Sequence, residues 1–222
     1  MTIYVPSRPK DYYMEVARGN IPGHVAVAVQ GDNPDVDGPE DVWSQGATWV
    51  APVAATKHNV VSSSTADDST GTGLRTALFY GLDADWNIAS ETITMDAATT
   101  VTTGMPIGKG RAMSAIYSVP LGKTLYIVAF GGALVKTAAA GTAAVEIDLQ
   151  VRLNADTDTA GWITVVEGGE QTTGTSTENF VLPFPAVVAA KSDVKLRVSL
   201  ASTTNIDFAG RFNGIQIDDG AD

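Results

Sequence analysis

The sequence of 222 residues contains no cysteine. This absence excludes disulfide frameworks, zinc sites built from thiolates and cysteine nucleophiles together. It also fits synthesis in a reducing cytoplasm. A chain of this length can bury about 70% of the surface of its unfolded form, so the protein is expected to fold without a disulfide or a structural metal.

Long apolar runs and positive charge are also scarce. No stretch approaches eighteen consecutive apolar residues without a charge, so no membrane-spanning helix is predicted and no membrane partner is expected. Met1–Pro6 has no basic region before an apolar run, so we expect no secretory signal. Lysine and arginine number 14 against 25 acidic residues, and the net charge of -11 argues against a surface that binds nucleic acid.

Residues that commonly carry catalysis are few. His24 and His58 are the only histidines, and neither lies in a recognisable nucleophile motif. The residues therefore indicate no enzyme and no cofactor. Alanine, threonine, valine and glycine dominate, whereas long helix-forming side chains are scarce, which is typical of a β protein with many turns.

The clearest pattern lies in residues 144–153, where apolar and polar side chains alternate without a break. A strand with this alternation places one face on a core and the other in water. We interpret it as a central strand of an antiparallel sheet. Residues 194–200 repeat the pattern. The predicted core accordingly includes Val145, Ile147, Leu149, Val151, Val194, Leu196 and Val198.

Short strand patterns separated by turn signals continue along most of the chain, which favours an all-β, jelly-roll-like antiparallel sandwich. Residues 24–30 and 43–53 are predicted strands. Residues 111–118 are expected to form a hairpin with residues 123–130 through a turn that contains proline and glycine. Residues 168–177 are predicted to be a polar loop.

The expected organisation is an N-terminal segment, residues 1–23, followed by a sandwich over residues 24–222. The N-terminal segment is either a strap across its own domain or an arm that reaches a neighbouring subunit. Its tyrosines, Tyr4, Tyr12 and Tyr13, are candidates for contacts with a partner. The segment 102–110 is rich in glycine and either joins two β subdomains or two sheets of one sandwich.

The most acidic segment, Gly31–Asp41, allows two structural interpretations. Asn33, Asp35 and Asp37 are spaced like the first ligands of a calcium-binding EF-hand loop, with Gly38 in the position of its glycine. Ser44, however, stands where the bidentate glutamate belongs. A turn-rich solvated loop is the favoured interpretation, and a weak calcium site is the alternative.

Several segments together resemble a group of small β-rich structural proteins of tailed bacteriophages, especially marine ones. The resemblance lies in the segments Tyr12–His24, Ser62–Thr76, Gly81–Trp86, Ile116–Thr124 and Asp193–Arg197, and in the loop Asn33–Asp37. These segments are turns and strands, and the group has no catalytic signature to carry over to this chain. The resemblance implies a protein of the virion, made in the host cytoplasm.

Within a virion, we expect a capsid decoration, or cement, protein that binds the outside of the major capsid protein lattice, by analogy of fold. Lattice positions near local threefold axes favour a homotrimer. The alternative is a component of the neck, tail or fibre that contacts host glycans through exposed tryptophans.

Overall fold

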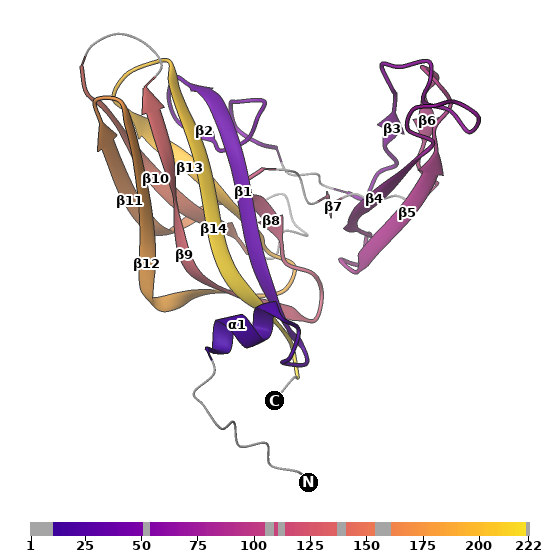
Figure 1. The fold of residues 1–222 in the computed structure, drawn as a ribbon. Coiled ribbons are helices and arrows are strands. Elements are labelled where there is room, and N and C mark those ends of the chain that lie inside the picture. Colours follow the sequence, from indigo (N-terminus) through magenta and orange to yellow (C-terminus); the bar gives the residue numbers. More distant parts are fainter. Residues whose placement is uncertain are drawn as a thin grey trace.

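The computed structural model describes residues 11–50, 54–104, 109–110, 114–136, 141–153 and 161–220. These residues form an antiparallel β-sandwich with a smaller group of strands beside it (Figure 1). The fold is therefore all-β, as the sequence predicted.

The first sheet of the sandwich has the order β1-β14-β9-β12, and each neighbouring pair is antiparallel. Its strands are β1 (His24–Val36), β9 (Lys123–Lys136), β12 (Thr175–Val188) and β14 (Ile206–Asp218). β1 and β12 are the edges. The pairing of β12 with β9 shifts register between Val181 and Ala186, where two prolines interrupt the strand, as expected for an edge.

The second sheet has the order β11-β10-β13-β2, and β8 also pairs with β13. Its strands are β2 (Glu40–Asp41), β8 (Ile116–Ser118), β10 (Ala143–Arg152), β11 (Ile163–Thr172) and β13 (Asp193–Ala201). β10 lies between β11 and β13, which confirms the predicted central strand.

β2 and β8 are two parts of one edge strand, because they pair with successive residues of β13. If they count as one strand, the sandwich strands in chain order are β1, β2/β8, β9, β10, β11, β12, β13 and β14. If these eight strands are numbered 1 to 8 in that order, the first sheet has the order 1-8-3-6 and the second sheet has the order 5-4-7-2. This interleaved order is that of a jelly roll.

The edge strand is interrupted by residues 43–114, which we call the insertion. Val42 N–H donates to Leu196 O (3.0 Å), and Leu196 N–H donates to Ala115 O (2.9 Å). Ala115 N–H also donates to Val42 O (3.1 Å), so the insertion leaves and rejoins the strand at one point. β1 passes close to this point, and a Cβ on Gly31 would lie 2.2 Å from Ala115 N. Glycine is therefore required there.

The described residues of the insertion form two small antiparallel sheets, which lie to one side of the sandwich (Figure 1). One has the order β5-β4-β7 and the other pairs β3 with β6. Their bounds are β3 (Asn59–Val60), β4 (Thr76–Leu82), β5 (Ile88–Thr94), β6 (Val101–Thr102) and β7 (Lys109–Gly110). Trp86, which is 1% exposed, accepts a hydrogen bond on its carbonyl from Leu121 N–H (3.0 Å), in the turn between β8 and β9. A division near 102–110 stays a prediction.

The core lies between the two sheets of the sandwich. All seven residues predicted from the alternating strands are buried in it, together with Phe130, Phe208 and Phe212. Phe180 stacks near Phe130 with ring centroids 5.2 Å apart. Its ring occupies the space where a Cβ on Gly168 would stand (2.7 Å). Alternation alone therefore located the centre of the core.

Four local predictions were wrong. Residues 43–50 form no strand, because Trp49 N–H donates to the Asp41 carboxylate and Trp43 Nε1–H donates to Ala47 O rather than to a strand partner; residues 51–53 lie outside the described part. β8 pairs with β13 and β9 with β12 and β14, so the turn between them joins two sheets and closes no hairpin. Residues 168–172 and 175–177 belong to strands β11 and β12. The acidic segment is strand as far as Val36, with an irregular register between Asn33 and Val36.

The N-terminal segment begins in the described part with α1 (Tyr12–Ala17), whose N-cap Asp11 accepts a hydrogen bond from Tyr13 N–H (3.0 Å). α1 lies across the lower end of the first sheet and contacts β1 (Figure 1). Residues 1–10 lie outside the described part, so the choice between a strap and an arm stays open there. In the described residues, no helix is long and apolar enough to cross a membrane.

Candidate functional site

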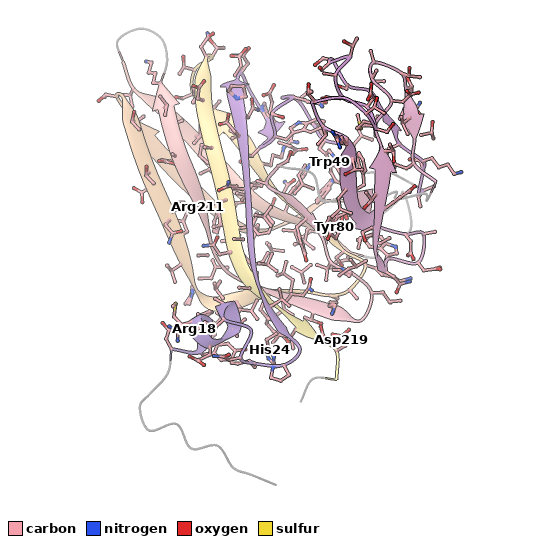
Figure 2. The ribbon with its side chains drawn as sticks, turned by 45° about the vertical axis from the view of Figure 1, so that its right-hand side comes forward. Arg18, His24, Trp49, Tyr80, Arg211 and Asp219 are labelled. Atoms are coloured by element: carbon pink, nitrogen blue, oxygen red, sulfur yellow. The ribbon has the colours of Figure 1, made fainter. Side chains whose placement is uncertain are left out.

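The outer face of the second sheet carries a group of charged side chains that are buried. Strand alternation directs Asp193, Lys195 and Arg197 of β13 away from the core. The sequence predicted that this face meets water, which holds for Glu146 but is wrong for Asp148, Arg152 and Lys195, which are buried. Lys195 and Asp193 are each 1% exposed. Asp41 and the ring of Trp162 lie against Lys195, and Arg152 and Ser118 bond to Asp193. Figure 2 labels Trp49, a residue of the insertion, where the insertion meets the sandwich.

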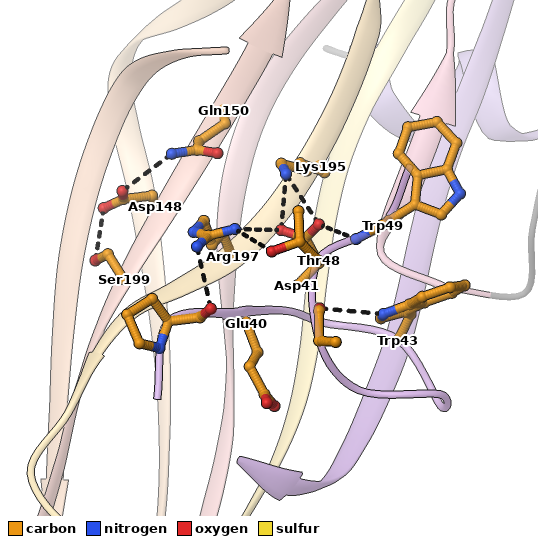
Figure 3. A network of polar contacts seen from close by, with 12 residues as sticks. Glu40, Asp41, Trp43, Thr48, Trp49, Asp148, Gln150, Lys195, Arg197 and Ser199 are labelled. Atoms are coloured by element: carbon orange, nitrogen blue, oxygen red, sulfur yellow. Dashed lines mark hydrogen bonds and ion pairs between the residues drawn. The ribbon is translucent and has the colours of Figure 1, made fainter. Parts of the chain in front are cut away.

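Asp41 is the centre of this group and is 0% exposed. The ammonium of Lys195 lies 2.8 Å from Asp41 Oδ1 and donates to Oδ2 at 2.9 Å. Arg197 donates to Oδ1 at 3.3 Å, and the backbone N–H of Trp49 donates to Oδ2 at 2.6 Å (Figure 3). One carboxylate thus joins β2, β13 and the insertion.

Residues 43–50 are held by further bonds from the same strand. Arg197 donates to Thr48 Oγ1 (3.3 Å) and to Pro39 O (3.0 Å). Within the segment, Trp43 Nε1–H and the N–H of Asp41 both donate to Ala47 O. We call residues 43–50, with their bonds to Asp41 and Arg197, the latch. The latch fixes the first part of the insertion against the sandwich.

Aromatic rings cover the remaining side of the lysine. The Lys195 ammonium lies 4.2 Å from the ring centroid of Trp162, and the Arg152 guanidinium lies 5.7 Å from the same ring. Trp49 meets Trp162 edge to face, with centroids 6.2 Å apart. Trp162 directly precedes β11, so the start of β11 lies beside the charged group.

A second buried ion pair adjoins the first. Arg152 donates to Asp193 Oδ2 at 2.6 Å, and Ser118 Oγ donates to Asp193 Oδ1 at 2.6 Å. Arg152 Nε has no hydrogen-bond partner in the described part of the chain. This pair ties β8 to β10 and β13, on the other side of the point where the insertion rejoins the strand.

The electrostatics of the group are dominated by burial. Desolvation lowers the pKa of Lys195, and the hydrogen bond and charge of Asp41 oppose that shift. An amine of lowered pKa can act as a nucleophile, but both oxygens of Asp41 occupy it and its side chain is shielded. The arrangement is therefore suited to holding the insertion rather than to reacting with a substrate.

The candidate calcium ligands are used in local structure. Asn33, which is 1% exposed, donates through Nδ2 to Glu40 Oε2 (2.9 Å) and to Asp41 O (3.3 Å). Its Oδ1 accepts from Asp35 N–H (3.2 Å). Asp37 accepts from the backbone N–H of Asn205 (3.1 Å). In the described ranges, no group of three histidine, cysteine, aspartate or glutamate side chains is placed to hold a metal ion.

The candidate partner contacts lie at the start of α1. Tyr12 is 44% exposed and Tyr13 is 52% exposed, and their rings meet edge to face with centroids 5.7 Å apart. Tyr12 also lies edge to face with His24, at 6.1 Å. Tyr4 lies outside the described residues. The two described tyrosines are accessible to a partner.

Sequence reasoning missed the latch and its ion pairs. The alternation correctly placed Lys195 and Arg197 opposite the core, but it carried no signal that a segment about 150 positions earlier would cover them. The tryptophans were the available signal, since Trp49 and Trp162 are partly buried over the charges.

Comparisons with protein-family models, with curated proteins and with solved structures find no match to this chain.

Proposed function

We propose that this protein is a structural component of a bacteriophage virion, and that it decorates the head by binding the outside of the major capsid protein lattice. The observation that carries the proposal is the insertion in the edge strand of a jelly roll. The latch bonds this insertion to the second sheet, and its strands β4 and β5 expose a face to which they contribute no charge. Jelly rolls recur in viral capsid domains, and the sequence resembles virion proteins of tailed phages. Both supports are analogies at the level of fold and family.

The sheet face in question belongs to the hairpin of β4 and β5. Leu78 (54% exposed) and Tyr80 (61% exposed) project from one face, opposite Thr92 and Ser90, and Ile88 (55% exposed) lies beside them. Within β4 and β5 the remaining exposed positions on this face are threonines, so these two strands contribute no charge to it in a chain of net charge -11. Exposed large apolar side chains among uncharged polar ones are typical of a protein-binding surface.

The insertion that carries this surface is bonded to the jelly roll at more than one place. A protein that cements a lattice must transmit force between subunits, so its contact element has to be held firmly by its own domain. Two attachments, one at Asp41 and one where Trp86 meets the turn before β9, hold the insertion on the jelly roll. This arrangement supports a role for the insertion in docking.

Co-sedimentation with capsids that lack this protein tests the proposal. Wild-type protein should pellet with the capsids and saturate at a ratio that matches a repeated lattice site. The double variant Leu78→Asp/Tyr80→Asp places two charges on the uncharged face and should lose binding. Val181→Asp, at a 72% exposed position on β12, is the matched control and should bind like the wild type. Equal binding by all three proteins would reject this face, and no binding by the wild type would reject the capsid.

A second candidate function is a neck, tail or fibre component that contacts host glycans. It is favoured by Trp43, Trp49 and Trp162, which are all partly exposed in the region of the latch. Rings of this kind can stack on sugars. Trp43→Ala is the informative variant, since the indole N–H of Trp43 donates within its own segment, to Ala47 O. Glycan retention that falls with Trp43→Ala while capsid binding is absent would favour this candidate.

A further inference from the structure

The buried pair of Lys195 and Asp41 holds an amine and a carboxyl group in direct contact. Nζ of Lys195 lies 2.8 Å from Oδ1 and 2.9 Å from Oδ2 of Asp41, so the amine is centred on the carboxyl group (Figure 3). The two residues are 154 positions apart in the sequence and belong to β13 and β2. An amine and a carboxyl group are the two groups from which an amide bond is made.

The surroundings of the pair keep water away from it. The side chain of Lys195 is 1% exposed and that of Asp41 is 0% exposed. The ring of Trp162 lies over the amine at 4.2 Å, and Ile116, which is 2% exposed, is the neighbour of Lys195 on β8. Water opposes the joining of an amine to a carboxylate because it solvates both separate charges, and a dry site removes that opposition.

Burial also favours the uncharged forms of both groups. Desolvation lowers the pKa of Lys195, and the hydrogen bond to Asp41 gives its proton a direct path to the carboxylate. Transfer of that proton leaves a neutral amine, which is a nucleophile, against a neutral carboxylic acid. Arg197, 3.3 Å from Oδ1, opposes the transfer because its charge stabilises the carboxylate. The neutral pair is therefore a minor form, and a reaction through it is slow.

The backbone around Asp41 fixes the two groups in place. β2 pairs with β13, and this pairing sets Asp41 opposite Arg197, two residues from Lys195. The backbone N–H of Trp49 holds Oδ2 at 2.6 Å. Groups fixed in contact in this way react as if at effective concentrations of about 10⁵–10⁸ M, which compensates for a small reactive fraction.

The condensation of the pair balances without a further reactant. Nζ bonds to Cγ of Asp41, and the bond from Cγ to Oδ1 breaks. Two of the three ammonium protons move to Oδ1, which leaves as water, and the third stays on the amide nitrogen. The N–H of Trp49 binds the negative charge that collects on Oδ2 in the tetrahedral intermediate. One positive and one negative charge are consumed together, so the product is neutral.

We propose that Lys195 and Asp41 condense in the folded protein to an amide that joins β13 to β2 covalently. The ion pair is the state in which the chain first folds, and the amide follows it slowly. The link encloses the whole insertion, residues 43–114, in a covalent ring, so a pull on the insertion is carried to β13 by a covalent bond. The bond lies inside one chain and forms whether or not the protein binds a capsid.

Mass spectrometry of the intact full-length chain tests the condensation. Protein held folded at neutral pH for several days is denatured and weighed beside protein held unfolded in urea. The folded sample should reach a mass one water below that of the sequence, during the incubation or before it, and the unfolded chain should lose no more. A folded sample that keeps the full mass of the sequence would overturn the proposal.

Two variants separate this loss of water from others. Asp37–Gly38 and Asp219–Gly220 can also lose water, by closing a succinimide on the backbone, and Lys195→Arg leaves both unchanged. Lys195→Arg keeps a cation beside Asp41 but removes the amine, so it should keep its full mass. The matched control is Lys123→Arg, at an exposed pair with Asp218, and it should lose water like the wild type. Equal loss from Lys195→Arg and the wild type would refute the assignment to Lys195.

Peptide mapping of the wild type locates the link without depending on the folding of a variant. Trypsin should fail to cleave after Lys195, and a branched peptide should join the segment that contains Lys195 to the segment that contains Asp41. Lys123 and Asp218 should remain unlinked, because their side chains are 24% and 44% exposed to water. A branch at that exposed pair instead, or no branched peptide at all, would contradict the proposal.

Discussion

Removing the Asp41 carboxylate should strongly destabilise the protein. In Asp41→Ala, the ammonium of Lys195 stays 1% exposed and loses both acceptor oxygens, and Arg197 and the N–H of Trp49 lose theirs. Breaking a buried ion pair from one side costs about 3–5 kcal/mol, because a charge remains without compensation. Urea unfolding monitored by tryptophan fluorescence measures this cost.

Two further variants separate the buried charge from other causes. Arg18→Ala breaks an ion pair with Glu15 whose arginine is 61% exposed, and it should cost at most about 1 kcal/mol. Asp41→Asn with Lys195→Met removes both charges and keeps an acceptor for Trp49, so it should recover much of the loss. If Asp41→Ala costs no more than Arg18→Ala, the latch does not depend on this ion pair.

The same site gives a dependence on pH with a definite sign. Burial lowers the pKa of Lys195, and the loss of Asp41 removes the main opposing effect. The unfolded chain then binds more protons than the folded chain between the lowered pKa and the ordinary value near 10.5, so stability rises with pH in that window. The difference in unfolding free energy between wild type and Asp41→Asn should therefore shrink as the pH is raised toward 10.5. A constant difference would contradict the account of Lys195.

Four other outcomes are expected. Leu149→Ala should lower the unfolding free energy by about 2–5 kcal/mol because Leu149 is 0% exposed, and a cost near zero in urea unfolding would contradict its place in the core. Gly31→Ala should prevent correct closure of the edge strand, since its Cβ would lie 2.2 Å from Ala115 N, and a native melting temperature would refute that approach. Burial raises the pKa of Glu170, so the contribution of Glu170 to stability falls as the pH rises above about 4.5. Glu170→Gln should therefore weaken the dependence of the melting temperature on pH between about pH 4 and 7, and an unchanged dependence would contradict the raised pKa. Treatment with a chelator should leave the melting temperature unchanged, whereas a drop of several degrees would revive a calcium site at residues 33–41.

The parts of the fold that sequence predicted are those in which local pattern and tertiary environment agree. β10 and β13 alternate strictly and are internal to a sheet, so period two was enough to identify their buried face. Phe180–Pro185 was recognised as an edge because proline cannot donate to a ladder.

The failures share one cause, which is a partner distant in sequence. Residues 168–177 are rich in glycine and threonine and were predicted to be a loop, but Gly168 makes room for the ring of Phe180 on β12 in the facing sheet. The turn at 119–122 has good turn chemistry, yet its flanking strands pair in different sheets. Local chemistry predicts that the chain turns and does not say which strand it meets next.

Reconstruction of the intact virion by electron cryomicroscopy tests the proposed function most directly. The account predicts density with the shape of the jelly roll and its insertion at repeated positions over the capsid lattice, on the outer surface of the head. A single ring or spike at one vertex would contradict the decoration role and favour the neck or tail, and the absence of this density from the virion would contradict a structural role altogether.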